Sequence, residues 1–216
     1  LFLEGYKPIV LKRSSSKTWR IDEILKYLPV YNIDKCSLKQ PFIDFGNIDI
    51  IIHTATNYGR NGEDIETIYD SNTFFPLKLL EISSQYSTKY FINTDTALNS
   101  DINAYALSKK QFLEWGKFFS RQKFNFINLK IEHVYGPGDD DSKFITGLIK
   151  KCIQNVDQID LTLGNQKRDF IFIDDVVSAY FVILKSGLKE DGEYFKEYNV
   201  GSGKPVLIRD LVELIH

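Results

Sequence analysis

The sequence contains no methionine, not even at position 1, and only two cysteines, Cys36 and Cys152. The cysteines lie far apart and outside any Cys-x-x-Cys spacing, so neither a disulfide framework nor a zinc site is indicated. No apolar run approaches the length of a membrane span, and the N-terminus lacks the layout of a signal peptide, so a cytoplasmic location is expected. Because the chain opens on LFLEGYKPIVLKR and stops within a helical pattern at LVELIH, we expect it to be an internal piece of a longer protein.

Several other kinds of site are not indicated either. The net charge of -2 gives no whole-protein reason to expect a nucleic acid or an anionic membrane as a partner. His53, His133 and His216 have no ligand spacing between them, so a metal site is not expected. The three aspartates at 139–141 read as a solvated loop rather than a calcium site, and no Gly-x-Ser-x-Gly elbow offers an esterase nucleophile.

Strands alternate with helices along almost the whole chain, and 216 residues suffice for one α/β domain or one and part of a second. This order predicts an α/β fold with a doubly wound parallel sheet covered on both faces. Strands are expected at 7–12, 29–33, 48–52, from 90, at 124–131, 160–162, 168–173 and from 198. Helices are expected from a cap at Ser16 to 27, over 63–84 with a kink at Pro76, over 105–119 and 142–152, after a cap at Asp174 and Asp175, and from 208.

The stretch YFINTDTALNSDINAYALSK, residues 90–109, carries the strongest chemical signal. It reads as a buried strand that ends in Thr94, Asp95 and Thr96, then a short loop, then a helix that opens on Tyr105 with Lys109 one turn later. Residues at i and i+4 share one helix face, so the phenol and the ammonium group can point to the same place. Open α/β sheets place their ligands at the carboxyl ends of strands. The stretch therefore predicts proton transfer to a carbonyl or from an alcohol.

Each candidate residue also has a purely structural interpretation. Tyr31 and Lys35 match the same Tyr-x-x-x-Lys spacing without a strand and hydroxyls before them, and Tyr105 could be a half-buried residue of a surface helix. His53 ends an apolar strand, where a packed histidine is a more common role than a base or a ligand. Arg168 is either a surface charge before a strand or a clamp for a phosphate.

Several motifs, in this order, resemble the extended short-chain dehydrogenase/reductases, in particular the NAD-dependent epimerase/dehydratase branch that acts on nucleotide sugars. They are IIIHTAT, SNTFFPLKLLE, the stretch at 90–109, HVYGPG, RDFIFIDDVV and YNVGSG, and they span nearly the whole chain. NTDT, EHVYGPGD and QKRDFIFIDDVVSAY look most like CDP-abequose synthase and related reductases of nucleotide-linked 4-keto-6-deoxyhexoses. The resemblance implies a Rossmann-type portion over 1–135 and a sugar-nucleotide-binding portion over 136–216, interleaved with the last elements of the sheet.

The resemblance also implies roles for individual residues. Tyr105 would protonate the C4 oxygen of the sugar as the nicotinamide delivers hydride to C4, and Lys109 would lower the pKa of the phenol and hold the nicotinamide ribose. Thr96 would hydrogen-bond the same oxygen, with Thr94 as the alternative hydroxyl. The residues expected beside the cofactor are Arg13, Ser14, His53, Ala55 and Asn72, with Tyr105 and Lys109. The residues expected against the substrate are Thr96, His133 and Arg168, with Arg168 on the pyrophosphate.

Two departures from the family pattern narrow the function. Sugar-nucleotide dehydratases carry Asp-Glu directly after the catalytic Thr, whereas Thr96 is followed by Ala97 and Thr94 by Asp95 and Thr96, so dehydration is disfavoured. The Gly-x-x-Gly-x-x-Gly loop, whose N–H groups hold the phosphates of the cofactor, is absent and is expected upstream of Leu1. The chain by itself should therefore bind a dinucleotide poorly.

By the resemblance, the first expected strand of this chain, at 7–12, corresponds to the family's second strand. The residues at its end therefore indicate which cofactor the chain binds. An acidic residue there would bond the ribose 2′-OH of NAD, but the chain has Lys12, Arg13, Ser14 and Ser15, which suit the 2′-phosphate of NADPH. We therefore expect an NADPH-dependent reductase of the C4 ketone of a CDP- or dTDP-linked 4-keto-6-deoxyhexose, a homodimer that serves deoxysugar, O-antigen or capsule synthesis. The alternatives are an NAD-dependent nucleotide-sugar 4-epimerase with the same three residues, and a non-catalytic family member that binds a dinucleotide.

Overall fold

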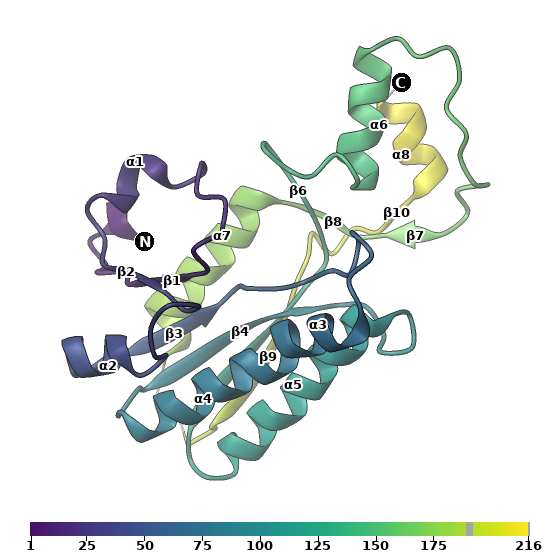
Figure 1. Cartoon of the computed structure of the whole chain (residues 1–216). Helices are drawn as coiled ribbons and strands as arrows, with labels where there is room; N and C mark the ends of the chain where they lie inside the picture. Colours follow the sequence, from purple (N-terminus) through teal and green to yellow (C-terminus); the bar gives the residue numbers. More distant parts are fainter. Residues whose placement is uncertain (189–191, 216) are drawn as a thin grey trace.

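A four-stranded parallel sheet in the order β3-β4-β5-β9 forms the centre of the protein, seen in a computed structural model that describes residues 1–188 and 192–215 (Figure 1). The strands are β3 (Ile50–His53), β4 (Tyr90–Thr96), β5 (Asn125–Ile131) and β9 (Phe195–Val200). Their register places Ile52 beside Ile92 and Ile92 beside Ile127. The predicted α/β fold with a parallel sheet is confirmed.

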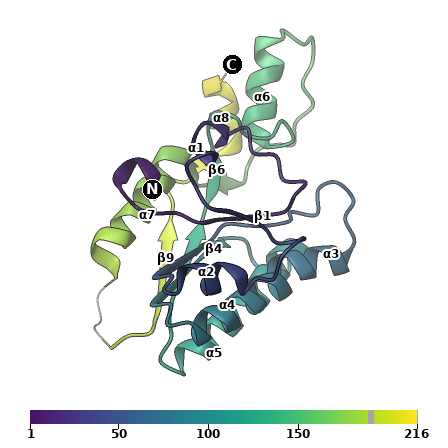
Figure 2. The same ribbon diagram turned by 60° about the vertical axis from the view of Figure 1, so that its left-hand side comes forward.

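Helices cover both faces of this sheet (Figures 1 and 2). One face packs against α4 (Phe75–Gln85) and α5 (Ala104–Ser120), and the other against α7 (Ile173–Val182). Because strand side chains alternate between faces, Phe91 and Phe126 pack against Phe112 of α5, whereas Ile92 and Leu129 face α7. Both faces are apolar, so the sheet is held from both sides.

The helix expected over 63–84 exists but is interrupted. It consists of α3 (Ile65–Tyr69), the π-helical turn η2 (Asp70–Phe74) and α4. Asp64 caps its start by accepting a hydrogen bond from the Thr67 N–H at 2.7 Å. Pro76 has no N–H to bond back to residue 72, and the wider π-helical turn directly before it accommodates the missing bond.

The first forty residues form a lightly packed unit around a second, two-stranded parallel sheet. Its elements, with the helix that follows it, are η1 (Phe2–Glu4), β1 (Val10–Lys12), α1 (Asp22–Leu25), β2 (Val30–Asn32) and α2 (Gln40–Phe45). No residue before Pro41 is buried. The prediction of a helix capped by Ser16 is wrong: α1 starts after Ile21, and the Ser16 Oγ accepts a hydrogen bond from the Arg13 N–H instead, because Ser16 closes a turn of its own.

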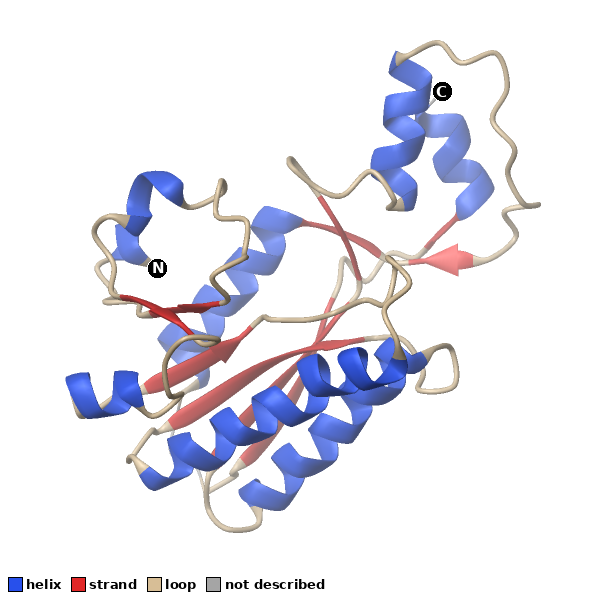
Figure 3. Cartoon of the chain, viewed as in Figure 1, coloured by secondary structure: helices blue, strands red, loops and turns tan. Residues whose placement is uncertain are grey.

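The C-terminal part adds the strand pairs β6-β8 and β7-β10 and the helices α6 and α8 beyond the main sheet (Figure 3). The strand β6 (His133–Tyr135) runs parallel to β8 (Phe170–Phe172), and β7 (Lys167–Arg168) runs antiparallel to β10 (Val206–Leu207). The helices α6 (Phe144–Ile153) and α8 (Ile208–Ile215) pack together at this end. The same part of the chain also returns to the main sheet as α7, η3 (Ile183–Gly187) and β9.

Two local predictions in this part are wrong. Residues 160–162 form no strand and join no sheet among the described residues, and all three are exposed. Asp174 and Asp175 do not cap α7; Phe172 holds the cap position, and the two carboxylates lie in the first turn. There they still face the positive end of the helix dipole.

Candidate active site

Tyr105 and Lys109 project from the first turns of α5. The helix begins where it does because the Asn103 side chain accepts a hydrogen bond from the Ala106 N–H at 2.8 Å, which caps the orphan donors of the first turn. Tyr105 is half-buried, and Lys109 is only 2% exposed. Burial lowers the pKa of Lys109 to about 8, against the charge of Asp95, which raises it. Lys109 is thus a buried cation whose charge depends on a nearby carboxylate.

Thr96 lies beside the Tyr105 phenol at the end of β4. Burial and the neighbouring Tyr58 raise the pKa of Tyr105 above its ordinary value, while a hydrogen bond with Thr96 acts in the opposite direction. The Thr94 hydroxyl is instead hydrogen-bonded to the Tyr180 hydroxyl of α7. The structure therefore brings Thr96 and Tyr105 together, with Lys109 one turn further along α5, and leaves Thr94 in contact with another helix.

The family resemblance implied that Lys109 would lower the pKa of the phenol, but the positive charge that lowers it in the structure is that of Arg60. Arg60 and Tyr58 come from the loop after β3 and were missed in the sequence. The ring of Tyr58 lies 5.0 Å from that of Tyr105, and the Arg60 guanidinium lies 4.8 Å from the Tyr58 ring. No spacing rule links residues 58 and 60 to residue 105, because the contact depends on the path of the loop.

Asn72 holds that loop against α5. Its Oδ1 accepts hydrogen bonds from the Asn57 N–H at 2.7 Å and from the Thr56 hydroxyl at 3.2 Å. Its Nδ2 donates to the Asn57 carbonyl at 2.8 Å and to the Ser108 Oγ at 3.0 Å. Asn72, fully buried, therefore positions the loop that carries Tyr58, whereas Ala55 in the same loop is exposed.

A buried polar cluster under the end of β4 surrounds Asp95. Its Oδ2 accepts hydrogen bonds from the Lys110 ammonium and from the Asn128 side chain, both at 3.0 Å, and its Oδ1 accepts one from the Thr96 N–H at 2.7 Å. The Lys110 Nζ also donates to the Thr96 carbonyl at 2.6 Å. These three donors offset the cost of burying the Asp95 carboxylate, and the hydrogen bond from the Thr96 N–H holds the Thr96 backbone in place.

The same cluster extends as a polar row across the whole sheet at one register position. His53 Nδ1 donates to Asn93 Oδ1 at 3.2 Å, Asn93 Nδ2 donates to Asn128 Oδ1 at 2.8 Å, and Asn128 Nδ2 donates to Glu197 Oε2 at 2.9 Å. The signal for this row was in the sequence: Phe-Ile-Asn occurs at 91–93 and again at 126–128, in neighbouring strands.

His53 is a packed histidine, as its own strand context indicated. It is 3% exposed and contacts the rings of Phe75, Phe91 and Phe112. Burial, then the charge of Lys109, lowers the pKa of His53 to about 3, so the ring stays neutral. Its Nε2 is buried with no hydrogen-bond partner among the described residues.

The β1–β2 edge carries the basic loop that follows β1. Lys12, Arg13 and Ser14 are at least partly exposed there, and the Ser14 N–H and hydroxyl both bond to the carboxylate of Asp34, in the turn after β2. Beside them, the Asn32 Oδ1 is buried without a hydrogen-bond partner in the described part of the chain. An orphaned acceptor next to exposed cations and hydroxyls suits the base and ribose of a nucleotide.

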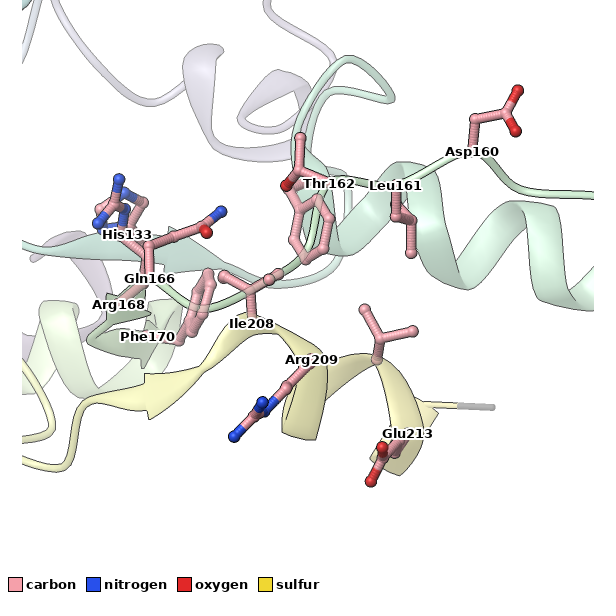
Figure 4. A pocket seen from close by; sticks show the side chains of 13 residues that line it. His133, Asp160, Leu161, Thr162, Gln166, Arg168, Phe170, Ile208, Arg209 and Glu213 are labelled. Atoms are coloured by element: carbon pink, nitrogen blue, oxygen red, sulfur yellow. The ribbon is translucent and has the colours of Figure 1, made fainter.

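His133 and Arg168 line a cavity of 560 Å³ between β6–β8 and the helices α6 and α8 (Figure 4). Burial and the charge of Arg168 lower the pKa of His133, so its ring is neutral near pH 7. Arg209 of α8 supplies a second guanidinium to the lining. The other lining residues include Phe144, Asp160, Thr162, Gln166, Phe170 and Glu213. The cavity thus combines aromatic walls with two cations.

Within residues 1–188 and 192–215, no group of three His, Cys, Asp or Glu side chains is arranged to hold a metal ion, and His216 lies outside these ranges. The helices in these ranges include none that is long and apolar enough to cross a membrane.

Comparison with known proteins gives consistent matches. A model described as "NAD dependent epimerase/dehydratase family" matches residues 1–201. The chain is 39% identical to CDP-abequose synthase of Salmonella muenchen over its full length, which is 73% of that protein. It is 25% identical to dTDP-4-dehydro-6-deoxyglucose reductase of Escherichia coli over 99% of the chain and 74% of that protein. The fold matches UDP-glucuronic acid 4-epimerase of Bacillus cereus, solved with UDP-glucuronic acid and NAD, with a TM-score of 0.82 at 18% identity over 98% of the chain and 74% of that structure.

Proposed function

Because the chain belongs to the NAD dependent epimerase/dehydratase family, an oxidoreductase-type enzyme family, we propose that it reduces the C4 ketone of a nucleotide-linked 4-keto-6-deoxyhexose. The observation that carries the proposal is the hydrogen bond between Thr96 and the Tyr105 phenol, at the start of the helix that carries the buried Lys109 one turn later. The similarity to CDP-abequose synthase and to a dTDP-4-dehydro-6-deoxyglucose reductase supports a CDP or dTDP carrier. O-antigen or capsule precursor synthesis is the setting that fits such a product.

The geometry suits Tyr105 as the proton donor. A phenol is protonated at neutral pH, and it donates its proton more readily when its pKa is lowered towards that pH. The Thr96 hydrogen bond and the charge of Arg60 lower the pKa of Tyr105, against burial, which raises it. Thr96, bonded to the same phenol, orients the C4 oxygen, and the charge of Arg60 favours the negative charge that develops on the phenol as the proton leaves. A reduced nicotinamide bound at this site would supply the hydride.

The surroundings of Asp95 support reduction over dehydration. If Thr94 were the catalytic hydroxyl, Asp95 would stand where dehydratases carry their acid, but its carboxylate is buried and bonded to Lys110 and Asn128. The next position, which would need a Glu to remove a proton, is Thr96. Neither group is available for the expulsion of water.

We assign the nucleotide of the substrate to the cavity beside α6 and α8. Arg168 and Arg209 would pair with the pyrophosphate, since guanidinium groups bind phosphate oxygens bidentately. The rings of Phe144 and Phe170 offer stacking surfaces for the base, and the neutral His133 would contact the sugar side. This assignment keeps the proposed division into a dinucleotide portion over 1–135 and a sugar-nucleotide portion over 136–216.

The β1–β2 edge supports NADPH as the cofactor. Lys12, Arg13 and Ser14 offer two cations and a hydroxyl to a 2′-phosphate, and the orphaned Asn32 Oδ1 offers an acceptor to an adenine amino group. Near the nicotinamide end, Lys109 and Tyr105 are the groups that would hold the ribose. His53 and Asn72 would act by positioning, since both are buried and bonded to the chain itself.

A second candidate is a nucleotide-sugar 4-epimerase that keeps NAD bound. It is favoured by the close fold match to a 4-epimerase and by the fact that the same three residues would serve it. A non-catalytic role is disfavoured, because Thr96, Tyr105 and Lys109 are all present and Thr96 is hydrogen-bonded to Tyr105.

A homodimer is also proposed. Helices α3 to α5 expose a group of large apolar side chains away from the sheet: Ile65, Tyr69, Phe74, Leu107, Trp115 and Phe118. A second copy of the same face would cover them. Sedimentation equilibrium should give the mass of two chains, and a monomer at micromolar concentration would contradict this.

The decisive test supplies NADPH and CDP-4-keto-6-deoxyglucose to the chain, extended at its N-terminus by a Gly-x-x-Gly-x-x-Gly phosphate-binding loop, and follows nicotinamide absorbance. We expect oxidation that falls about 10²- to 10⁴-fold in Tyr105→Phe, the usual worth of a general acid. Oxidation no faster than in Tyr105→Phe would refute the reductase. Interconversion of 4-epimers without net oxidation would establish the epimerase instead.

A further inference from the structure

An internal carboxylate occupies the donors of the loop that we assign to the cofactor's ribose. The strands β1 and β2 run parallel with Lys12 beside Asn32, so the residues two positions further on, Ser14 and Asp34, meet above the strand ends. The Ser14 N–H donates to Asp34 Oδ1 at 2.7 Å, and the Ser14 hydroxyl donates to Asp34 Oδ2. A single carboxylate therefore takes both donors of Ser14.

A 2′-phosphate would need the same two donors. Backbone N–H groups and serine hydroxyls at a strand end are typical phosphate ligands, and a carboxylate satisfies them in the same way. Two anions bound to one pair of donors repel each other, so the phosphate can bind Ser14 only after Asp34 moves away. A ribose 2′-OH has no such conflict, because it can donate to the carboxylate.

We propose that Asp34 sets the choice between NADPH and NADH by competing with the 2′-phosphate for Ser14. The inference rests on the proposed placement of the cofactor at the β1–β2 edge. Lys12 and Arg13 attract the phosphate from one side, and Asp34 opposes it from the other. The Ser14 hydrogen bonds also lower the pKa of Asp34, which keeps the carboxylate charged at neutral pH. The Asp34 carboxylate therefore reduces the preference for NADPH over NADH.

The test measures binding of two fragments that do not need the upstream phosphate-binding loop: adenosine 2′-monophosphate and adenosine 5′-monophosphate, titrated by NMR. In Asp34→Asn the affinity for the 2′-phosphate should rise roughly tenfold relative to the 5′-phosphate, the scale of one nearby charge at a surface. Adding Ser14→Ala should remove that gain. The matched control is Asp44→Asn, because Asp44 also accepts two side-chain hydrogen bonds, from Tyr31 and Gln40, but does not contact Ser14.

An unchanged affinity ratio in Asp34→Asn would overturn the inference, and so would an equal gain in Asp44→Asn. The inference would also be overturned if adenosine 2′-monophosphate bound to none of the variants, because the ribose of the cofactor would then not lie at this loop. None of these results touches the reductase proposal, which is decided by the Tyr105→Phe comparison on the sugar substrate.

Discussion

The Tyr105 site and the β1–β2 edge are built in opposite ways. Lys109 is 2% exposed and stands on a helix that packs against the stacked rings of Phe91 and Phe126. In contrast, every residue from 1 to 40 is at least partly exposed. The groups that we propose for proton transfer are therefore fixed by the core, whereas the groups that would select the cofactor stand on a surface that a substitution can reshape without unfolding the sheet.

Removal of a core ring should break this contrast most strongly. Phe126 is fully buried between Phe91 and Phe195, and Phe126→Ala should cost about 3–5 kcal/mol of unfolding free energy through lost burial and a cavity. Leu11→Ala, in the half-buried β1, should cost about 1 kcal/mol. Urea unfolding followed by fluorescence compares the two. Equal costs would mean that the N-terminal unit is packed as firmly as the sheet.

The pH dependence of the proposed reduction tests how far burial in the core lowers the pKa of Lys109. Its folded pKa of about 8 lies below the value of a free lysine, so the cation is present below pH 8 and lost as pH rises through 8. Activity should fall about tenfold per pH unit above that point. For the same reason unfolding free energy should rise between pH 8 and the ordinary lysine pKa, since the unfolded chain then binds more protons.

Asp95→Asn sharpens this test, because the charge of Asp95 raises the pKa of Lys109. The midpoint of the activity profile should move below pH 8 in this variant. Glu197→Gln is the control: Glu197 bonds to the same Asn128 side chain but is not among the charges that shift Lys109. Thermal melts establish that both variants fold, and coincident pH profiles would contradict the role given to Asp95.

The smallest effect is expected at the exposed Arg60. Its charge lowers the pKa of Tyr105 from the surface, where solvent screens it, so Arg60→Ala should slow proton transfer only about two- to fivefold. Steady-state kinetics should show the loss in kcat. Arg121→Ala, at the far end of α5, should leave kcat unchanged, and an equal loss there would remove Arg60 from the site.

The sequence predicted the parts of the molecule that depend on local pattern. Alternating apolar strands and helices led to the parallel sheet, and the helix that carries Tyr105 and Lys109 begins within one residue of its expected start. The helix cap at Ser16 and the strand at 160–162 were predicted wrongly. A capping residue or a short apolar alternation forms a helix or strand only when the rest of the chain packs against it.

The contacts that were missed depend on register and loop path. Asp34 reaches Ser14 only because β1 and β2 are adjacent and in parallel register, and Tyr58 reaches Tyr105 only through a loop that Asn72 holds. The repeated Phe-Ile-Asn did contain information about register, since two identical polar positions in buried strands must find partners. Pairwise geometry of this kind is not visible in the spacing of residues along one strand.

The four hydrogen bonds of Asn72 also bear on how the site opens. Through Asn72 they join the loop that carries Tyr58 to Ser108 on α5. We therefore expect this loop and the helix that carries Tyr105 to move together. The loop cannot swing away from Asn72 to admit a ligand without breaking the three bonds that Asn72 makes with Thr56 and Asn57. We therefore expect access to the phenol to come from displacement of the opposite wall, the segment from 136 to 143 and the α6–α8 pair.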